Sequence, residues 1–393
     1  MVLTGQAVAT AARAWGNQGL LLVQSKFGTA LSRSFFQAST PGSAVYGFPR
    51  GVSGVASVDF STGRLGAGAD LRPYRTVAPA VERIVVIGDV HGDIDAFRSC
   101  LRMANLVDAD DAWAGGETVV VQLGDIFDRG DDDLPIEEWL YRLAMQARRT
   151  NGAVYSILGN HEMMNAMGDH SMATRKAFVP FEDLQPELDE FVGGDWSDLD
   201  DIPEWARCRL LAMSPGGPVG RLLSAHAVCM KVGDNLFVHG GLLPEHLRSA
   251  AEDADQAMEN LNKAACSWLL GEAPMPEAIW GENSPVWTRL YSSPESRDVD
   301  DVARAQLEEV LRLTRTKRMF VGHTPQRMGI NSGANGQVWR VDTGMSAMMG
   351  GHPEVLEIKG KEISILTENK SIPASKRVAR PQAPKEGSGK ARQ

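Results

Sequence analysis

Residues 84–93 read IVVIGDVHGD, a run of branched apolar side chains that passes directly into glycine, aspartate and histidine. An unbroken apolar run of this length is typical of a strand that is buried on both faces of a sheet. In α/β proteins, ligands bind at the carboxyl ends of such strands. The stretch therefore predicts an α/β fold with a polar site at one edge of its sheet.

The same arrangement recurs four more times along the chain. Apolar runs end in glycine next to Asp, His or Asn in residues 119–130 (VVVQLGDIFDRG), 154–162 (VYSILGNHE), 236–241 (LFVHGG) and 319–325 (MFVGHTP). Because the loops that follow parallel strands meet at one edge of a sheet, we expect all five loops to converge.

The polar residues of these loops have the chemistry of metal ligands. Imidazole nitrogens together with carboxylate and amide oxygens suit divalent Zn, Mn or Fe. Two ions could hold a hydroxide between them and clamp the oxygens of an in-line phosphoryl displacement. The natural bridge is Asp125. The candidate ligands for two ions are Asp89, His91, Asp125, Asn160, His239 and His323.

The rest of the pattern supports an α/β sheet enzyme. Strands are predicted at 83–90, 118–123, 153–158, 235–238, 318–321 and 338–341, with further strands around 354–358 and 363–366. Helical spacing of apolar residues occurs at 93–103 and 135–149. Residues 163–225 interrupt the strands and are predicted to be an insertion. Its stretch 182–204 has ten acids and no base, which favours a solvated surface over a substrate-selecting lid.

Three of the motifs together resemble a known family. Residues 89–92 (DVHG), 124–130 (GDIFDRG) and 159–162 (GNHE) are similar to the phosphoprotein-phosphatase branch of the calcineurin-like metallophosphoesterases, over roughly residues 82–366. The later motifs, at 239–244 (HGGLLP), 285–289 (PVWTR) and 322–325 (GHTP), look most like the Shewanella-like protein phosphatases. The resemblance implies a four-layer α/β/β/α sandwich with a mostly helical insertion.

The resemblance also implies how the metal ligands divide. Asp89 and His91 would hold the first ion, and Asp125 would bridge. The second ion would be held by Asn160, His239 and His323. Manganese is the expected metal, with iron or zinc as alternatives. The bridging hydroxide would attack phosphorus directly, so no covalent phosphoenzyme is needed.

The remaining roles concern the proton and the phosphate. His161 would protonate the leaving oxygen as general acid, oriented by Asp128. Arg129 would bind phosphate oxygens through its planar fork. Arg289 is a second candidate phosphate clamp, although it could instead form a structural stacking pair with Trp287.

Other histidines and one aspartate need separate interpretation. His226 lies thirteen residues before His239, and we interpret it as a structural or supporting residue, since every metal position is already filled. Asp342 could orient His323 or cap a turn. Surface or packing positions are expected for His170, His246 and His352.

The expected function is a metal-dependent phosphoprotein phosphatase acting on phosphomonoesters. One alternative is hydrolysis of a phosphoanhydride such as a diadenosine polyphosphate, but relatives with that activity generally lack the aspartate that here is Asp128. A second alternative is a non-catalytic phosphate-binding scaffold, which the complete ligand set opposes. The Ser-Ala-Pro-Asn-Tyr motif of the eukaryotic serine/threonine phosphatases has no counterpart, so the preference between phosphoserine/threonine and phosphotyrosine stays open.

Composition excludes several other classes. The chain has 393 residues with 40 Lys+Arg and 50 Asp+Glu, a net charge of -10, which argues against general binding to nucleic acid or anionic membrane. No apolar run approaches the roughly 18 residues of a membrane span. Its four cysteines form no C-x-x-C pair, which fits a reducing compartment. The sequence leaves the oligomeric state open.

The charge is unevenly distributed along the chain. Residues 1–60 carry +3 and residues 370–393 carry +6, so the body between them carries -19. The first segment is basic, rich in Ala, Ser and Gly and almost free of acids, which is typical of an organelle transit peptide. This predicts a chloroplast protein, with mitochondrion or cytoplasm as alternatives, and a merely disordered N-terminus as the simplest alternative. The tail at 370–393 is predicted to be disordered.

Overall fold

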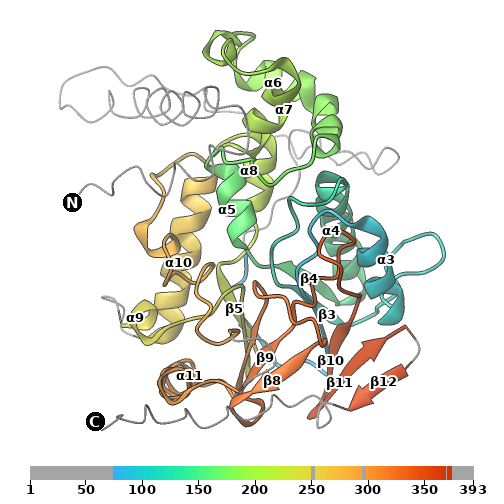
Figure 1. Ribbon diagram of the computed structural model, residues 1–393, viewed down its shortest axis with the longest axis vertical. Coiled ribbons are helices and arrows are strands. Elements are labelled where there is room, and N and C mark those ends of the chain that lie inside the picture. The colour runs from blue at the N-terminus through green and yellow to red at the C-terminus, as the bar shows by residue number, and fades with distance from the viewer. Residues whose placement is uncertain (1–73, 249–252, 294–297, 369, 374–393) are drawn as a thin grey trace, which may run out of the picture.

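Two mixed β-sheets form the centre of the molecule (Figure 1). The computed structural model describes residues 74–248, 253–293, 298–368 and 370–373. The predicted leader at 1–60 lies outside the described residues, as do residues 374–393 of the predicted tail.

The first sheet contains the three strands that the motif loops at 88–93, 123–130 and 157–162 follow. Its members are β2 (Arg83–Ile87), β3 (Val119–Gln122), β4 (Ala153–Ser156), β10 (Val355–Lys359), β11 (Glu362–Thr367) and β12 (Lys370–Pro373). The order is β12-β11-β10-β2-β3-β4. Strands β2, β3 and β4 are parallel, so their carboxyl ends lie at one edge, whereas β10 pairs antiparallel with β2.

The second sheet brings the other two motif loops to the site. Its members are β1 (Val77–Ala78), β5 (Cys229–Val232), β6 (Asn235–Val238), β7 (Arg318–Val321), β8 (Asn331–Gly333) and β9 (Val338–Arg340). The order is β1-β5-β6-β7-β9-β8, with β6, β7 and β9 parallel. The loops after β6 and β7 therefore leave the sheet in the same direction.

Alternating side chains bury both faces of each sheet. Val86 of β2 and Val121 of β3 pack in one apolar cluster with Phe237 of β6 and Phe320 of β7, whose rings stack 5.0 Å apart. Val85, on the opposite face of β2, belongs to a second cluster with residues of the covering helices. Because successive side chains of a strand point to opposite faces, the two clusters define an inner and an outer core.

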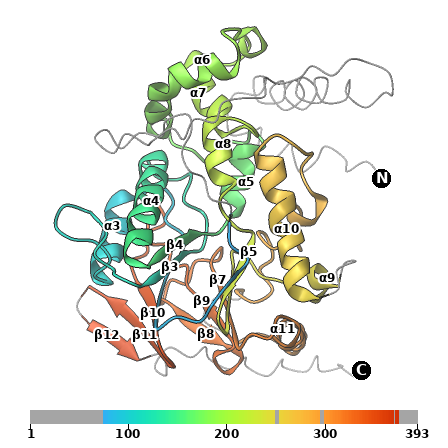
Figure 2. The same ribbon diagram turned by 180° about the vertical axis from the view of Figure 1, so that it is seen from behind.

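Helices cover the outer faces of both sheets. On the first sheet lie α3 (Ile94–Met103) and α4 (Asp133–Ala147), and on the second lie α9 (Pro244–Leu247), α10 (Ala254–Leu269) and α11 (Asp301–Thr314). Figure 2 shows the two groups on opposite sides of the molecule. The predicted α/β/β/α arrangement is therefore confirmed. Among the described residues, no helix is long and apolar enough to span a membrane.

A group of helices separates β4 from β5. It contains α5 (Asn160–Ala166), α6 (Gln185–Phe191), α7 (Glu204–Met213) and α8 (Pro218–Leu223), and it extends beyond the sheets in Figure 1. The residues between α5 and α6 include a 3-10 segment, Lys176–Leu184. In the acidic stretch 182–204, the acidic side chains are exposed except for Glu187, which is half-buried.

The boundary of the predicted tail is four residues too early. Residues 370–373, assigned to the tail by composition, form β12, which pairs antiparallel with β11 from Thr367↔Lys370 to Ser364↔Pro373. The predicted boundary rests on composition, because residues 370–393 contain three prolines and show no apolar periodicity. Composition of this kind gives no signal of a strand of four residues.

Candidate metal centre

The five motif loops converge at the carboxyl ends of β2, β3, β4, β6 and β7. Their side chains come from both sheets: the first sheet contributes residues of the loops at 88–93, 123–130 and 157–162, and the second those at 239–241 and 322–325. All six predicted metal ligands are buried in the cluster where these loops meet, none more than 5% exposed: Asp89, His91, Asp125, Asn160, His239 and His323.

Asp125 lies at the centre of the cluster. Its Oδ2 is 3.3 Å from His239 Nε2, 3.8 Å from His91 Nε2 and 3.9 Å from His161 Nε2. Two groups of ligand atoms, each within 4.8 Å of one another, share this carboxylate: His91, Asp125 and His161, and Asp125, His239 and His323. The arrangement fits two cation positions on either side of one carboxylate.

Asn160 and Asp89 complete the set of predicted ligands in different ways. Asn160 Oδ1 lies 3.1 Å from Nε2 of His239, which is a member of the second group. The carboxylate of Asp89 accepts the backbone N–H of His323, at 3.0 and 3.2 Å, and belongs to neither group of three among the described residues. Asp342 accepts the N–H of Gly344 at 2.7 Å, and its charge raises the pKa of Asp89. Asp342 therefore caps a turn beside Asp89.

Backbone carbonyls fix the orientation of the imidazole rings. His91 Nδ1 donates to Phe127 O at 3.0 Å and His239 Nδ1 donates to Leu123 O at 2.7 Å, so both rings turn Nε2 toward Asp125. His323 donates through Nε2 to Trp287 O at 3.0 Å, which leaves Nδ1 as its ligand atom. Fixing one ring nitrogen in this way selects the tautomer that a metal ligand needs.

Burial keeps two of these imidazoles neutral. It lowers the pKa of His91 to about 4. Burial and the charge of His239 lower the pKa of His323 to about 2. A neutral imidazole has a free lone pair, so both rings are suited to bind a cation near neutral pH.

His161 lies in a different electrostatic environment. Its Nδ1 is 2.6 Å from Asp128 Oδ2, while its Nε2 faces the cluster, 3.5 Å from a terminal nitrogen of Arg129. Burial would lower the pKa of His161, but the charge of Asp125 and the bond to Asp128 raise it above 6.5. Burial would raise the pKa of Asp128, but its hydrogen bond to His161 and the charge of that ring lower the pKa below its ordinary value. The two residues form a carboxylate–imidazole dyad that can carry a proton toward the cluster of predicted metal ligands.

The two predicted phosphate-binding arginines differ in how they are held. Arg129 packs one terminal nitrogen 3.1 Å from the sulfur of Met349. Arg289 is exposed and donates to His323 O and to Thr324 Oγ1, both at 2.8 Å. The ring of Trp287 packs against His323, with centroids 5.8 Å apart. Both guanidinium groups thus lie at the rim of the cluster, where an anion could reach them.

The backbone of the loops is strained where the functional side chains emerge. Five non-glycine site residues have φ in the left-handed region: His91 at 49°, Asp125 at 53°, Asp128 at 71°, Arg129 at 69° and His323 at 67°. Each such residue costs of order 1–3 kcal/mol and persists only where the surrounding structure fixes it. Strain concentrated in this way is characteristic of a functional site.

Three residues that support the site have no assigned role in the sequence prediction. Glu162 receives backbone N–H groups of the Asp125 loop, and its place inside the 159–162 motif was a usable signal. Asn165 donates to Asp128 Oδ2 at 2.9 Å, and buried Arg209 lies 3.2 Å from Asp128 Oδ1. Arg209 lies in α7, far from every motif, so no local pattern marks it.

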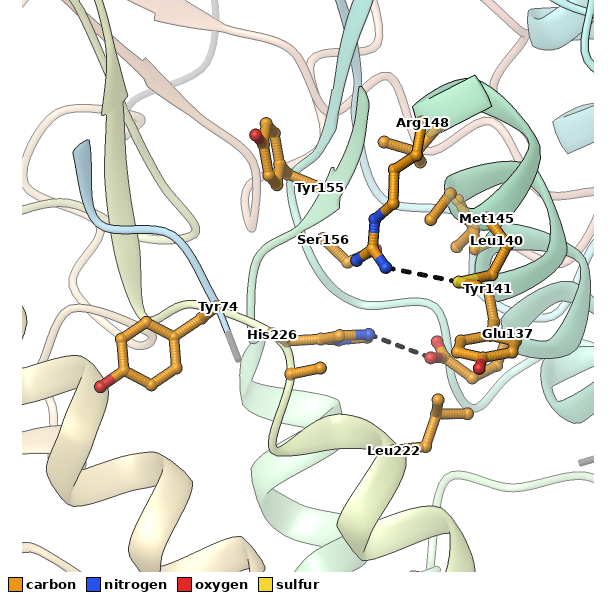
Figure 3. A pocket seen from close by; sticks show the side chains of 13 residues that line it. Tyr74, Glu137, Leu140, Tyr141, Met145, Arg148, Tyr155, Ser156, Leu222 and His226 are labelled. Atoms are coloured by element: carbon orange, nitrogen blue, oxygen red, sulfur yellow. Dashed lines mark hydrogen bonds and ion pairs between the residues drawn. The ribbon is translucent and has the colours of Figure 1, made fainter. Parts of the chain in front are cut away.

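The remaining histidines lie outside the metal cluster. His226 Nε2 is 3.0 Å from Glu137 Oε1 in a separate pocket that is bordered by α4 and β4 (Figure 3). His170 is buried against Asn165, with Nδ1 2.6 Å from Asn165 Oδ1. His246 accepts the backbone N–H of Leu243 through Nδ1, and His352 is exposed.

Comparison with known proteins shows which family this chain is similar to. Residues 82–327 match the calcineurin-like phosphoesterase family. The chain is 35% identical to Shewanella-like protein phosphatase 2 of Arabidopsis thaliana, over 73% of this chain and 78% of that protein. It is 27% identical to Shewanella-like protein phosphatase 1 of Plasmodium berghei, over 73% and 75%. Its fold is similar to a cold-active protein-tyrosine phosphatase of a psychrophilic Shewanella species, with a TM-score of 0.59, 23% identity and coverage of 77% and 83%.

The chain belongs to the calcineurin-like phosphoesterases, among the Shewanella-like protein phosphatases. It is therefore a hydrolase of the metallophosphoesterase class. The family uses divalent metal ions, and the buried His and Asp donors fit such ions because the two donor groups share one carboxylate.

Proposed function

We propose that this protein dephosphorylates phosphoproteins by hydrolysing phosphomonoesters with the aid of two divalent ions, manganese above iron or zinc. The observation that carries the proposal is the position of Asp125. Its carboxylate belongs to both donor groups and lies 3.9 Å from His161, the ring that Asp128 holds from the other side. Candidate cation ligands, a candidate proton donor and two arginines therefore lie around one carboxylate.

The ligand assignment follows the sequence prediction. Asp89 and His91 would hold one ion, Asn160, His239 and His323 the other, and Asp125 both. When bound, two such ions supply an activated water nucleophile and neutralise charge on the phosphoryl oxygens. Asp89 supports this assignment indirectly, since the backbone of His323 already orients its carboxylate.

The chain's own residues supply the proton and bind the phosphate. His161 presents Nε2 to Asp125 and Arg129 while Asp128 holds its Nδ1, so Nε2–H is available to the oxygen that leaves phosphorus. Arg129 and Arg289 would bind the non-bridging oxygens from the rim, and Arg289 is already fixed there by His323 and Thr324. Acid catalysis of this kind typically contributes about 10²–10⁴-fold to the rate.

The dyad also bears on the two alternative functions. A scaffold that only binds phosphate would need the arginines but no proton donor. A poor leaving group such as a serine or tyrosine oxygen needs protonation more than a phosphate leaving group does. The buried 2.6 Å contact between His161 and Asp128 therefore favours a phosphomonoesterase over both a scaffold and a phosphoanhydride hydrolase.

A comparison of substrates tests the proposal. The full chain, stripped with EDTA and reloaded with Mn²⁺, is assayed for kcat/KM on a phosphoserine peptide, a phosphotyrosine peptide and diadenosine tetraphosphate. We expect at least one phosphopeptide to exceed the dinucleotide by 10-fold or more, on the order of a single lost transition-state contact. Asp125→Asn should lose bound metal and activity together, whereas Asp131→Asn in the same loop should keep both. A preference for the dinucleotide would overturn the proposal.

On the composition of residues 1–60 alone, we also propose targeting to a plastid. A fusion of residues 1–73 to a fluorescent protein should enter plastids of plant cells, and the same fusion with its arginines and lysines changed to glutamate should stay outside. Import of the fusion into mitochondria would overturn the proposal.

A further inference from the structure

Arg209 lies behind the Asp128–His161 dyad, on the side away from the metal cluster. It belongs to α7, in the helical group between β4 and β5, and its side chain is fully buried. Burying a guanidinium is unfavourable unless its charge and its N–H groups find partners. The partners of Arg209 therefore indicate what the residue is for.

The partners are two buried carboxylates and the residues around them. A terminal nitrogen of Arg209 is 3.2 Å from Asp128 Oδ1, 2.8 Å from Asp133 Oδ2 and 2.8 Å from Asn165 Oδ1. The other terminal nitrogen donates to Ala177 O at 3.0 Å. The guanidinium thus serves as the buried cation for Asp128 and Asp133 together.

Three groups fix the orientation of the Asp128 carboxylate. Oδ2 accepts from His161 Nδ1 at 2.6 Å and from Asn165 Nδ2 at 2.9 Å, and Oδ1 faces Arg209. The backbone N–H of Asp128 also points to Asp133 Oδ2, at 3.3 Å, so Asp133 joins Arg209 to the same loop. If Arg209 is removed, Oδ1 loses its charged partner, and only the two contacts at Oδ2 still orient the carboxylate toward the imidazole.

Aromatic rings prevent Arg209 from adopting another position. Its guanidinium carbon lies 4.9 Å from the ring centre of Phe181, 5.2 Å from that of Phe178 and 5.9 Å from that of Phe127. Phe127 directly precedes Asp128, whereas the other two come from the segment before α6. Arg209 therefore links the position of α7 to the position of the loop that carries Asp128.

We propose that Arg209 is a positioning residue for proton transfer: it holds the Asp128 carboxylate in the orientation that fixes the ring of His161. The inference rests on the proposed function, because it takes His161 as the general acid. It also gives the helical group between β4 and β5 a role in catalysis. Among the described residues, the hydrogen bonds and ion pairs of Arg209 include none of the predicted metal ligands, so its effect passes through Asp128.

The experiment uses the dependence of the rate on the leaving group. A general acid matters most when the departing oxygen is a poor leaving group, because nitrophenolate leaves without a proton more readily than phenolate does. Mn²⁺-loaded wild type, Arg209→Lys, Arg209→Met and His161→Ala are compared on p-nitrophenyl phosphate and phenyl phosphate. Arg207→Met is the matched control: it lies on the same helix, is half-exposed and bonds to Ile202 O.

We expect Arg209→Met to lower kcat on phenyl phosphate by about 10-fold or more beyond its effect on p-nitrophenyl phosphate, within the range of acid catalysis. KM and metal content should stay near wild type. Arg209→Lys, which keeps the charge but loses the fork, should fall between, and it decides the question if the methionine variant does not fold. In a His161→Ala background, Arg209→Lys should cause no further leaving-group effect.

The outcomes separate the two proposals. Equal losses on both substrates in folded Arg209 variants, or a leaving-group effect that persists without His161, would overturn the role of Arg209 and leave the phosphatase proposal intact. If His161→Ala itself shows no dependence on the leaving group, the role of the acid fails, and the inference about Arg209 fails with it.

Discussion

Glu162 follows His161 in the chain and holds the loop that carries Asp125. Its Oε2 accepts the N–H groups of Gly159, at 2.7 Å, and Asp125, at 2.9 Å, and its Oε1 accepts that of Ile126 at 2.7 Å. The residue is fully buried. A carboxylate that receives several backbone N–H groups is a strong and directional contact. Glu162 therefore fixes the strained backbone at Asp125 by accepting the N–H groups of Asp125 and Ile126.

Replacing Glu162 tests this support. In Glu162→Gln one acceptor oxygen becomes an NH₂ group that must face backbone donors, so we expect unfolding to become easier by about 1–3 kcal/mol. Affinity for Mn²⁺ should fall as Asp125 becomes less well placed. Urea unfolding and metal titration measure the two effects. Glu190→Gln, an exposed glutamate of α6, is the control, and a Glu162 variant as stable as this control would contradict the supporting role.

Individual residues could be predicted from the sequence only where a motif brings several together. Asp125 and His161 follow apolar strands in short loops, so their neighbourhood is encoded within a few positions of the chain. Arg209 meets Asp128 across 81 positions, and only the packing of α7 places it there. A lone arginine in a helix carries no local signal of such a contact.

Among the elements, strands within an apolar run were predictable, and strands without one were not. The strand predicted at 83–90 ends at Ile87, because from Val90 onward the backbone bonds to the neighbouring loop: Val90 N and His91 N both donate to Asp125 O at 3.0 Å. β1 and β8 have two and three residues outside any apolar run, and pairing alone defines them. The three-residue β9 was predicted because it lies in the apolar run at 338–341.

Helix α4 is joined to the segment after α8 by a buried ion pair. Glu137 of α4 lies 3.0 Å from His226, which precedes β5, and both side chains are less than a tenth exposed (Figure 3). Burial would lower the pKa of His226, but the charge and hydrogen bond of Glu137 raise it above 6.5. The folded state therefore binds this proton more tightly than the unfolded chain does.

This pair should make stability depend on pH. A raised histidine pKa stabilises the fold fully below about 6.5, and that contribution is lost as the pH rises through the folded-state value. We expect the difference in unfolding free energy between wild type and His226→Gln to shrink as the pH rises from about 6.5 through the folded-state pKa of His226. Glu137→Gln should weaken the same pH dependence, because Glu137 is its source. If the unfolding free energies of wild type and His226→Gln changed with pH in the same way, His226 would not be the source of the pH dependence.

At the scale of the whole molecule, the predicted metal ligands come from both sheets. Asp89, Asp125 and Asn160 follow strands of the first sheet, whereas His239 and His323 follow strands of the second. The sequence predicted that the five loops converge, but not that they divide between two sheets. The relative placement of the sheets depends on the inner core, including the stacked Phe237 and Phe320. An ion bound by both sets of ligands would cross-link the sandwich.

Metal removal should therefore affect the stability of the entire fold. Burial and the charges of Asp342 and Asp125 raise the pKa of Asp89 well above its ordinary value, so these buried carboxylates repel one another unless a cation lies among them. Free metal at about 100 times its Kd should stabilise the protein by about 2.7 kcal/mol. We expect thermal unfolding of the EDTA-treated chain to shift upward on addition of Mn²⁺.

Two variants show whether this stabilisation comes from the proposed centre. Asp125→Asn removes the charge that both donor groups share, and its unfolding temperature should no longer respond to Mn²⁺. Asp131→Asn lies in the same loop, outside both groups, and should respond as the wild type does. A full response in Asp125→Asn would place the stabilising ion elsewhere in the molecule. If the shift instead disappears only in that variant, the ion that joins the two sheets is the one bound by Asp125, the carboxylate that both donor groups share.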